Sequence, residues 1–264
     1  MPCRIPQNIA GKIAYRKAKS NSRKQLIYGR SCSIMYAGYY ALMSDELKRN
    51  LYSVLSAVDR AAARTGSKVT VVAATKTLDA KTVSDVIELG LKDVGENRVQ
   101  EYLAKKDGVS GAKWHFIGTL QRNKAKYLVG NIALIQSVSN AALAEQIATL
   151  AEKRGVVQPV LVELNAGNEE SKTGARTDEI DELIEFVRGK KSLELRGLMA
   201  VPPIGAEDGV YRDAYKVFEK YRDGKFDILS MGMSGDYERA IEFGSNMVRI
   251  GTAIFGSRNA VRQQ

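Results

Sequence analysis

One lysine in this sequence occupies a position where a side chain can do covalent chemistry. Lys76 directly follows residues 69–75, a short apolar run rich in β-branched side chains that is typical of a buried strand. A lysine in a partly dry pocket has a lowered pKa, and its neutral amine can form a Schiff base with a carbonyl compound. Alternatively, Lys76 is a solvated residue that only opens a loop, and its position alone favours this alternative.

Two loops near the end of the chain are rich in small and hydroxylic residues, which suits a phosphate group. Residues 230–236 read Ser-Met-Gly-Met-Ser-Gly-Asp before a predicted helix, and residues 249–252 read Arg-Ile-Gly-Thr. Small residues let backbone N–H groups approach an anion, and a helix N-terminus adds positive potential. Ser234 and Thr252 add hydroxyl donors. We therefore expect a phosphate site at these loops, although the glycines could instead serve only tight turns.

Two further polar residues lie at or near predicted strand ends. Asn97 belongs to Gly-Glu-Asn-Arg at residues 95–98, and His115 belongs to Trp-His-Phe-Ile-Gly at residues 114–118. Either could face a ligand ring, but His115 could equally be a buried histidine held by hydrogen bonds. It is the only histidine, and both cysteines lie within residues 1–43, so we predict no metal site.

The elements that must position these residues alternate between helices and strands from residue 44 onward. Ser44 fits an N-cap, and apolar residues at helical spacing predict a helix over 45–65 that ends at Gly66. Amphipathic stretches predict further helices at 140–154, 178–189 and 211–222. Short apolar runs predict eight strands, at residues 69–75, 93–96, 114–118, 134–138, 160–165, 195–201, 228–233 and 247–255.

Eight strands separated by helices predict an α/β protein, a single (β/α)8 TIM barrel with an additional N-terminal helix. A doubly wound sheet is the alternative. It would carry a Gly-x-Gly-x-x-Gly turn after its first strand, where this sequence has Ala-Thr-Lys-Thr-Leu. Because TIM barrels bind ligands at the carboxyl ends of their strands, Lys76, Ser234 and Thr252 are all expected at the barrel mouth.

Positive charge is concentrated at the start of the chain. The 264 residues carry a net charge of +10, but residues 1–43 hold eight of the 40 basic residues and no acidic residue. The remainder has 32 basic against 30 acidic residues, an ordinary balance, so we predict no nucleic-acid partner. No stretch approaches the roughly 18 apolar residues that a membrane span requires, so we predict no membrane partner either.

We divide the chain into a basic extension at 1–43, the barrel at 44–258 and a short tail at 259–264. The extension contains arginine, lysine and serine without acidic residues, which is the composition of a mitochondrial presequence. Alternatively, it precedes a true start at Met43. We expect the extension to be disordered or to serve targeting. The protein is expected to be cytoplasmic, or mitochondrial if the presequence interpretation holds.

Several short motifs follow one another in the predicted order of strands and loops. They are 74–77 (Ala-Thr-Lys-Thr), 95–98 with Gln100 and Glu101, 115–118 with 121–124 (Gln-Arg-Asn-Lys), 169–174 (Glu-Glu-Ser-Lys-Thr-Gly), 197–199 (Gly-Leu-Met), 230–236, and 249–256 (Arg-Ile-Gly-Thr-Ala-Ile-Phe-Gly). Each motif is weak alone. The ordered set over residues 44–258 resembles the pyridoxal phosphate homeostasis protein family, whose barrel is related to the N-terminal domain of alanine racemase.

The resemblance implies that the protein binds pyridoxal 5'-phosphate (PLP) as a Schiff base on Lys76. The other contacts that it implies are phosphate contacts from Ser234, Gly251 and Thr252 with Gly235 nearby, Asn97 beside the ring, and Arg249 at the pyridine nitrogen. The aspartate-rich form of the 230–236 motif that is usual in the family is relaxed here, because Gly235 separates Ser234 from Asp236.

The resemblance also implies a role in PLP homeostasis without turnover, with no catalytic residue. In that role the protein buffers the cofactor or delivers it to apo PLP-dependent enzymes, and we expect a monomer. The alternative is a PLP-dependent amino-acid racemase or decarboxylase. A two-base racemase needs a second acid/base group across the substrate, and no extra domain is evident to supply it. If Lys76 is not the attachment residue, Lys172 is the next candidate.

Overall fold

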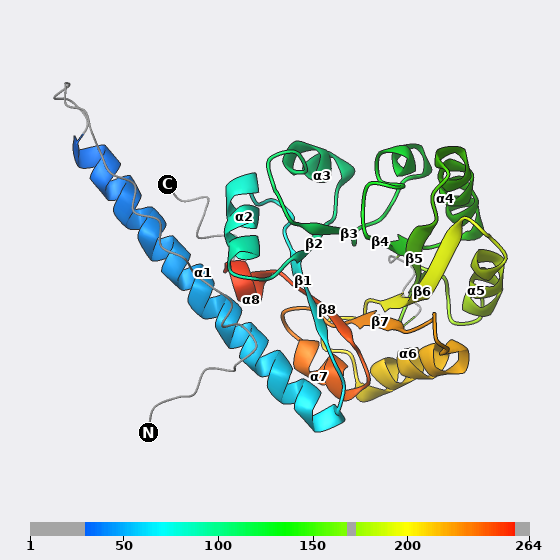
Figure 1. Ribbon diagram of the computed structural model, residues 1–264. Helices are drawn as coiled ribbons and strands as arrows, with labels where there is room; N and C mark the ends of the chain where they lie inside the picture. The colour runs from blue at the N-terminus through cyan, green and yellow to red at the C-terminus, as the bar shows by residue number, and fades with distance from the viewer. Residues whose placement is uncertain (1–29, 168–172, 257–264) are drawn as a thin grey trace. The chain divides into compact units, whose positions relative to one another are not determined.

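The computed structural model of the protein describes residues 30–167 and 173–256, with side chains from residue 45 onward. Its centre is a closed barrel of eight parallel strands that follow one another around the ring in chain order, which confirms the predicted (β/α)8 fold (Figure 1). The strands are β1 (Thr70–Ala74), β2 (Asp93–Glu96), β3 (Lys113–Phe116), β4 (Leu134–Val138), β5 (Gln158–Leu164), β6 (Leu193–Ala200), β7 (Ile228–Met231) and β8 (Met247–Ile250).

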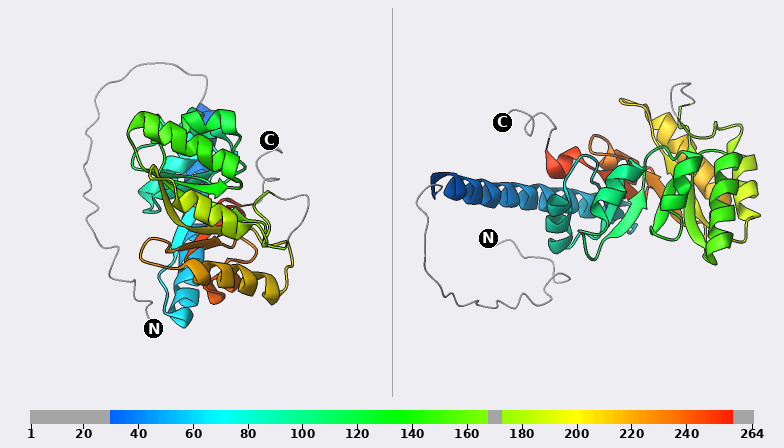
Figure 2. Two further views of the ribbon diagram at one scale, coloured as in Figure 1. Left: turned by 90° about the vertical axis from the view of Figure 1, so that its right-hand side faces the viewer. Right: turned by 90° about the horizontal axis from the view of Figure 1, so that it is seen from above.

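Helices of the barrel unit cover the outside of this ring, as two further views show (Figure 2). The helices of the described residues are α1 (Arg30–Thr65), α2 (Ala80–Glu88), α3 (Val99–Lys105), the 3-10 helix η2 (Arg122–Tyr127), α4 (Ala141–Arg154), α5 (Ile180–Arg188), α6 (Asp208–Tyr221), α7 (Tyr237–Glu242) and α8 (Thr252–Phe255). Helix α4 illustrates how the sequence sets the bounds. The side chain of Asn140 accepts a hydrogen bond from the amide of Leu143, and Gly155 ends the helix in a left-handed conformation.

The bounds of two predicted elements were wrong. Helix α1 begins at Arg30, so Ser44 lies inside the helix and is not its N-cap. Residues 30–43 contain no proline, so nothing in their composition stops a helix from continuing upstream. The strand predicted over 247–255 ends at Ile250, because Gly251 adopts φ −113° and ψ −81° and α8 begins at Thr252.

The chain divides into two units, Met1–Ala41 and Leu42–Gln264, and the barrel belongs to the second. Within that second unit, five apolar side chains of α1 are buried: Leu51, Val54, Ala57, Val58 and Ala61. Of the helices within residues 30–167 and 173–256, none combines the length and apolarity needed to cross a membrane.

The barrel interior changes character along the strands. Its lower layer is a small apolar cluster formed by Val72, Leu134, Leu161, Met199 and Met247, with Ile228 packed against it. Side chains two residues further along a strand point to the same side, one step closer to the carboxyl ends. The next layer therefore contains four buried polar side chains, those of Gln136, Glu163, Ser230 and Arg249.

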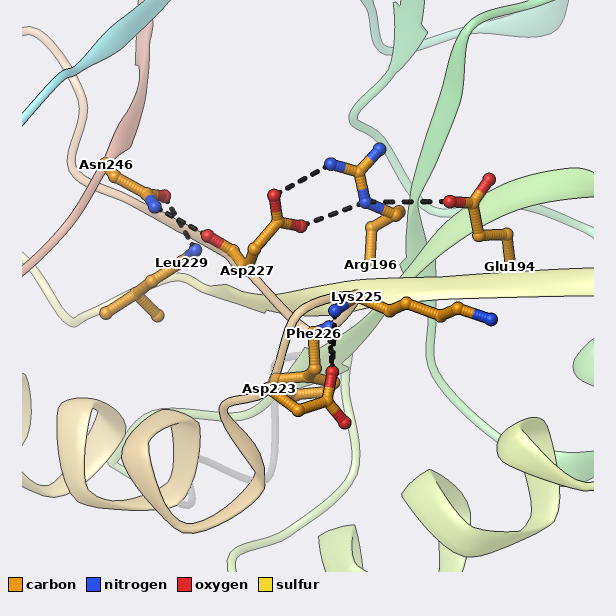
Figure 3. A network of polar contacts seen from close by, with 8 residues as sticks. All are labelled: Glu194, Arg196, Asp223, Lys225, Phe226, Asp227, Leu229 and Asn246. Carbon is orange, nitrogen blue, oxygen red and sulfur yellow. Dashed lines mark hydrogen bonds and ion pairs between the residues drawn. The ribbon is translucent and has the colours of Figure 1, made fainter.

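Polar contacts link β6, β7 and β8 near the amino-terminal end of the barrel (Figure 3). Arg196 makes two parallel hydrogen bonds of 2.9 Å to the carboxylate of Asp227. The side chain of Asn246 donates to the carbonyl oxygen of Asp227 at 2.6 Å and accepts from the amide of Leu229 at 2.8 Å. This face of a TIM barrel contributes stability, which leaves the opposite face for a ligand.

Candidate functional site

The two loops that the sequence indicated as a phosphate site lie together at the carboxyl ends of β7 and β8. The Oγ atom of Ser234 accepts hydrogen bonds from the backbone amides of Gly251 at 3.1 Å and Ala253 at 3.2 Å. Ser234 is half-buried, whereas Thr252, between the two amides, is exposed. Hydroxyl groups and backbone N–H groups therefore converge here, which is the donor set that an anion requires.

Two glycines in the loop after β7 play different roles. Gly232 has φ 101°, and a Cβ atom on it would lie 2.6 Å from the Cβ atom of Ala240, so both conformation and packing require glycine there. Gly235 is exposed, and a Cβ atom on it would meet nothing within 4 Å. Packing among the described residues therefore does not require glycine at position 235.

Asp236 stabilises the same loop through two hydrogen bonds. Its Oδ1 atom accepts from the amide of Met233 at 2.6 Å, and its Oδ2 atom accepts from the hydroxyl of Tyr211 at 2.8 Å. Burial, together with the hydrogen bond to Asp236, raises the pKa of Tyr211 to about 12, so the tyrosine remains a donor at neutral pH. The loop that carries Ser234 is thus fixed to helix α6.

Arg249 lies buried beneath these loops and reaches from β8 across to β7 and β6. Its Nη1 atom donates to the Oγ atom of Ser230 at 2.7 Å and to the carbonyl oxygen of Ser230 at 2.8 Å. Its Nη2 atom donates to the carbonyl oxygen of Ala200 at 3.0 Å. Burial lowers the pKa of Arg249 to about 10, which still leaves the guanidinium charged at neutral pH.

A chain of hydrogen bonds continues from Arg249 through the barrel interior. The hydroxyl of Ser230 donates to Oε1 of Gln136 at 2.7 Å, and Nε2 of Gln136 lies 3.0 Å from Nδ1 of His115. Nε2 of His115 lies 3.1 Å from Oδ1 of Asp93. His115 is 5% exposed and belongs to this internal chain. The structural interpretation of His115 is therefore favoured over a contact with a ligand at the mouth.

Glu163 is a buried carboxylate in the polar layer that the sequence analysis did not single out. Its Oε1 atom accepts from the hydroxyl of Thr173 at 2.7 Å, and Oε2 has no hydrogen-bond partner among the described residues. Burial raises the pKa of Glu163, against the opposing effects of the Thr173 hydrogen bond and the positive charge of Arg249. A clear strand alternation, Leu161 then Glu163, is the signal that could have placed it inside the barrel.

Lys76 lies just beyond β1 and is exposed. Its side chain is therefore open to solvent in the structure. Strand β1 pairs with β8, and a Cβ atom on Gly251 would lie 3.4 Å from the carbonyl oxygen of Ala74. The loop that carries Lys76 therefore adjoins the turn of the phosphate site. The alternative lysine, Lys172, lies outside the described residues.

Asn97 follows β2 on the other side of β1. The Oδ1 atom of Asn97 is buried and has no hydrogen-bond partner among the described residues. A Cβ atom on Gly118 would lie 2.2 Å from the backbone carbonyl oxygen of Asn97, so this close approach requires glycine at position 118. A cleft of about 290 Å³ opens beside it, lined by Asn97, Arg98, Val99, Gln100, Phe116, Thr119, Gln121 and Lys124. Strands β7, β8, β1 and β2 are consecutive in the ring, so all seven predicted cofactor residues lie along one side of the mouth.

Comparison with known proteins agrees with this architecture. The family model described as "Alanine racemase, N-terminal domain" matches residues 45–259. The fold and this match define the chain as a single-barrel protein of the alanine racemase N-terminal-domain class.

Individual relatives assign the chain to one family within this class. The pyridoxal phosphate homeostasis protein of Aquifex aeolicus is 38% identical over 223 residues, which are 81% of this chain and 97% of that protein. The protein of the same name from Escherichia coli K12 is 36% identical over 235 residues, 81% of this chain and 98% of that protein. PipY of Synechococcus elongatus, in its structure with PLP bound, has a TM-score of 0.68 at 25% identity and covers 80% of this chain and 100% of its own. The chain belongs to the pyridoxal phosphate homeostasis protein family.

Proposed function

We propose that this protein binds PLP at the barrel mouth and serves in PLP homeostasis. The observation that carries this proposal is the junction of Ser234 with the amides of Gly251 and Ala253, next to the loop of Lys76. An anion site and a nearby amine suit a ligand that is both a phosphate ester and an aldehyde. The relatives named pyridoxal phosphate homeostasis protein and the structure of PipY with PLP bound support this proposal.

Each predicted residue would contact a different part of PLP. Ser234, Thr252 and the amide of Gly251 would hold the phosphate, Gly235 would leave room beside it, and Lys76 would be the attachment amine. Asn97 would lie beside the ring, and Arg249 would donate a hydrogen bond to the pyridine nitrogen from its fixed, buried position. When bound, the cofactor supplies an aldehyde that condenses with amines and a ring that withdraws electrons.

The protein acts in this proposal as a carrier without turnover, as a monomer, and it delivers PLP to apo-enzymes. The compartment would be the cytoplasm, or the mitochondrion if residues 1–43 are a presequence. A direct test is transfer. The loaded protein, freed of unbound PLP, is mixed with an apo PLP-dependent enzyme, and recovery of that enzyme's activity is timed. Recovery no faster than the spontaneous dissociation of PLP would contradict delivery and leave only storage.

A further inference from the structure

The residue before Lys76 is held at three of its atoms. The Oγ1 atom of Thr75 donates to Oε1 of Glu96 at 2.7 Å, and its amide donates to the carbonyl oxygen of Gly95 at 2.9 Å. Its carbonyl oxygen accepts from Nζ of Lys105 at 2.8 Å. Thr75 is fully buried, so the backbone that enters Lys76 has one well-defined position.

The groups that hold Thr75 form a buried ion pair. Nζ of Lys105 lies 2.7 Å from Oε1 of Glu96, and the two side chains are 7% and 1% exposed. A buried ion pair is costly to desolvate, and replacing it with apolar residues often stabilises a fold. Here both partners also bond to Thr75. The pair therefore has a specific structural effect at this position, which is to fix the end of β1 against α3.

The residue after Lys76 has an unusual backbone conformation. Thr77 has φ 68°, and it is the one non-glycine residue with positive φ in the described ranges 30–167 and 173–256. A β-branched residue rarely adopts this conformation. The amide of Thr77 donates to Oε2 of Glu101 at 2.9 Å, and Glu101 lies on α3. Strain of this kind persists where surrounding contacts enforce it, and such sites concentrate at functional positions.

We propose that Glu96, Glu101 and Lys105 are positioning residues that fix the backbone on both sides of Lys76 and so aim its amine at the bound cofactor. We call these three residues the α3 clamp. The proposal rests on the proposed function, because it takes Lys76 to be the attachment residue. Since Lys76 itself is exposed, its backbone rather than a surrounding pocket sets where the amine lies. The α3 clamp therefore fixes the backbone from which the exposed side chain of Lys76 extends.

The test uses variants of Glu101 and Thr77 and leaves the buried ion pair intact. Removal of Lys105 or Glu96 would leave the charge of the other residue buried without a partner. Glu101→Ala removes the acceptor for Thr77, whereas Glu101→Gln keeps a carbonyl oxygen there. Thr77→Gly adopts positive φ without strain, but glycine is also free to leave this conformation, so the backbone after Lys76 becomes less restricted. The matched control is Glu88→Ala on α2, an exposed glutamate with no hydrogen bond or ion pair among the described residues. For each protein, the rate of PLP attachment is followed by visible absorbance, the melting temperature is measured without PLP, and exchange of the Thr77 amide is measured by NMR.

We expect Glu101→Ala and Thr77→Gly to slow attachment by about tenfold or more, since small displacements of a reacting group are costly. Exchange of the Thr77 amide should rise in Glu101→Ala, while Glu101→Gln and Glu88→Ala stay near the parent in both measurements. Melting temperatures should not account for the order of the rates. Attachment at the parent rate in both Glu101→Ala and Thr77→Gly, with Lys76→Ala unable to attach PLP, overturns the clamp alone. Unchanged attachment in Lys76→Ala overturns the proposed attachment residue and the clamp together.

Discussion

Nη1 of Arg249 donates a hydrogen bond to Oγ of Ser230 at 2.7 Å, within the barrel and below the candidate cofactor site. Burial lowers the pKa of Arg249 to about 10, so at neutral pH the group is a charged donor that accepts no hydrogen bond. A pyridine nitrogen facing it would stay unprotonated, and the ring would then withdraw electrons weakly. The buried chain from Ser230 to Asp93 holds the guanidinium in this role.

The first prediction concerns catalysis. Because Arg249 disfavours the protonated ring, we expect no appreciable racemase, decarboxylase or transaminase turnover of the loaded protein with common amino acids. Incubation with a panel of L- and D-amino acids, followed by chiral chromatography, measures this. Multiple turnovers that disappear in Lys76→Ala would contradict the carrier proposal and favour the enzyme alternative.

The second prediction concerns the phosphate. Ser234→Ala removes the hydroxyl that joins the amides of Gly251 and Ala253, and Thr252→Ala removes an exposed hydroxyl beside them. Each change should weaken PLP binding by about 1–2 kcal/mol. Titration with unphosphorylated pyridoxal is the control, and its affinity should barely change. Equal losses for both ligands would mean that these residues shape the barrel and do not hold phosphate.

The third prediction concerns pH. Burial raises the pKa of Glu163, so the folded protein holds this proton more tightly than the unfolded chain does. The resulting stabilisation is fully present below the ordinary carboxyl value of 4.5 and is lost as pH rises through the folded pKa. Glu163→Gln cannot ionise, so its free energy of unfolding should fall less than that of the parent as pH rises above 4.5.

Glu88→Gln is the control for this titration, because Glu88 is exposed on α2. Denaturant unfolding at a series of pH values gives the profiles. Parallel profiles for the parent and Glu163→Gln would show that Glu163 ionises without cost and that its burial is compensated elsewhere.

Much of this architecture could be predicted from the sequence. Short apolar runs located all eight strands, and small and hydroxylic residues after the seventh and eighth strands marked the two loops that we propose to bind phosphate. The end of β8 was missed because Thr-Ala-Ile-Phe is equally compatible with a strand and with a buried helical turn. Periodicity alone cannot distinguish those two structures.

The polar interior was harder to predict. Gln136 and Glu163 are placed inward only by the register of the strands, and Gln136 is held by Ser230, which lies 94 residues further along the chain. The ion pair of Glu96 and Lys105 joins the end of β2 to the end of α3, and its contact with Thr75 depends on the pairing of β1 with β2. Contacts of this kind depend on how the elements pack, which has no local pattern in a single sequence.

The fourth prediction concerns the N-terminal extension. Among the residues of α1 whose side chains the structure describes, those from residue 45 onward, Leu51 and Val58 are buried in the core. We expect a protein that starts at Met43 to keep these contacts, to melt within about 3 °C of the full chain and to bind PLP equally well. A much larger loss would show that residues 1–42 stabilise the barrel. Import into isolated mitochondria with cleavage before Met43 would support the presequence interpretation.

The central claim is that Lys76 is the amine to which PLP attaches, and borohydride reduction tests it most directly. The loaded protein is reduced, digested and mapped by mass spectrometry, beside a Lys76→Ala protein treated in the same way. We predict that the cofactor mass is found on the peptide containing Lys76 and that the variant loses both the visible band and the labelled peptide. A variant that keeps the band, with the label on another peptide such as that of Lys172, would contradict the account.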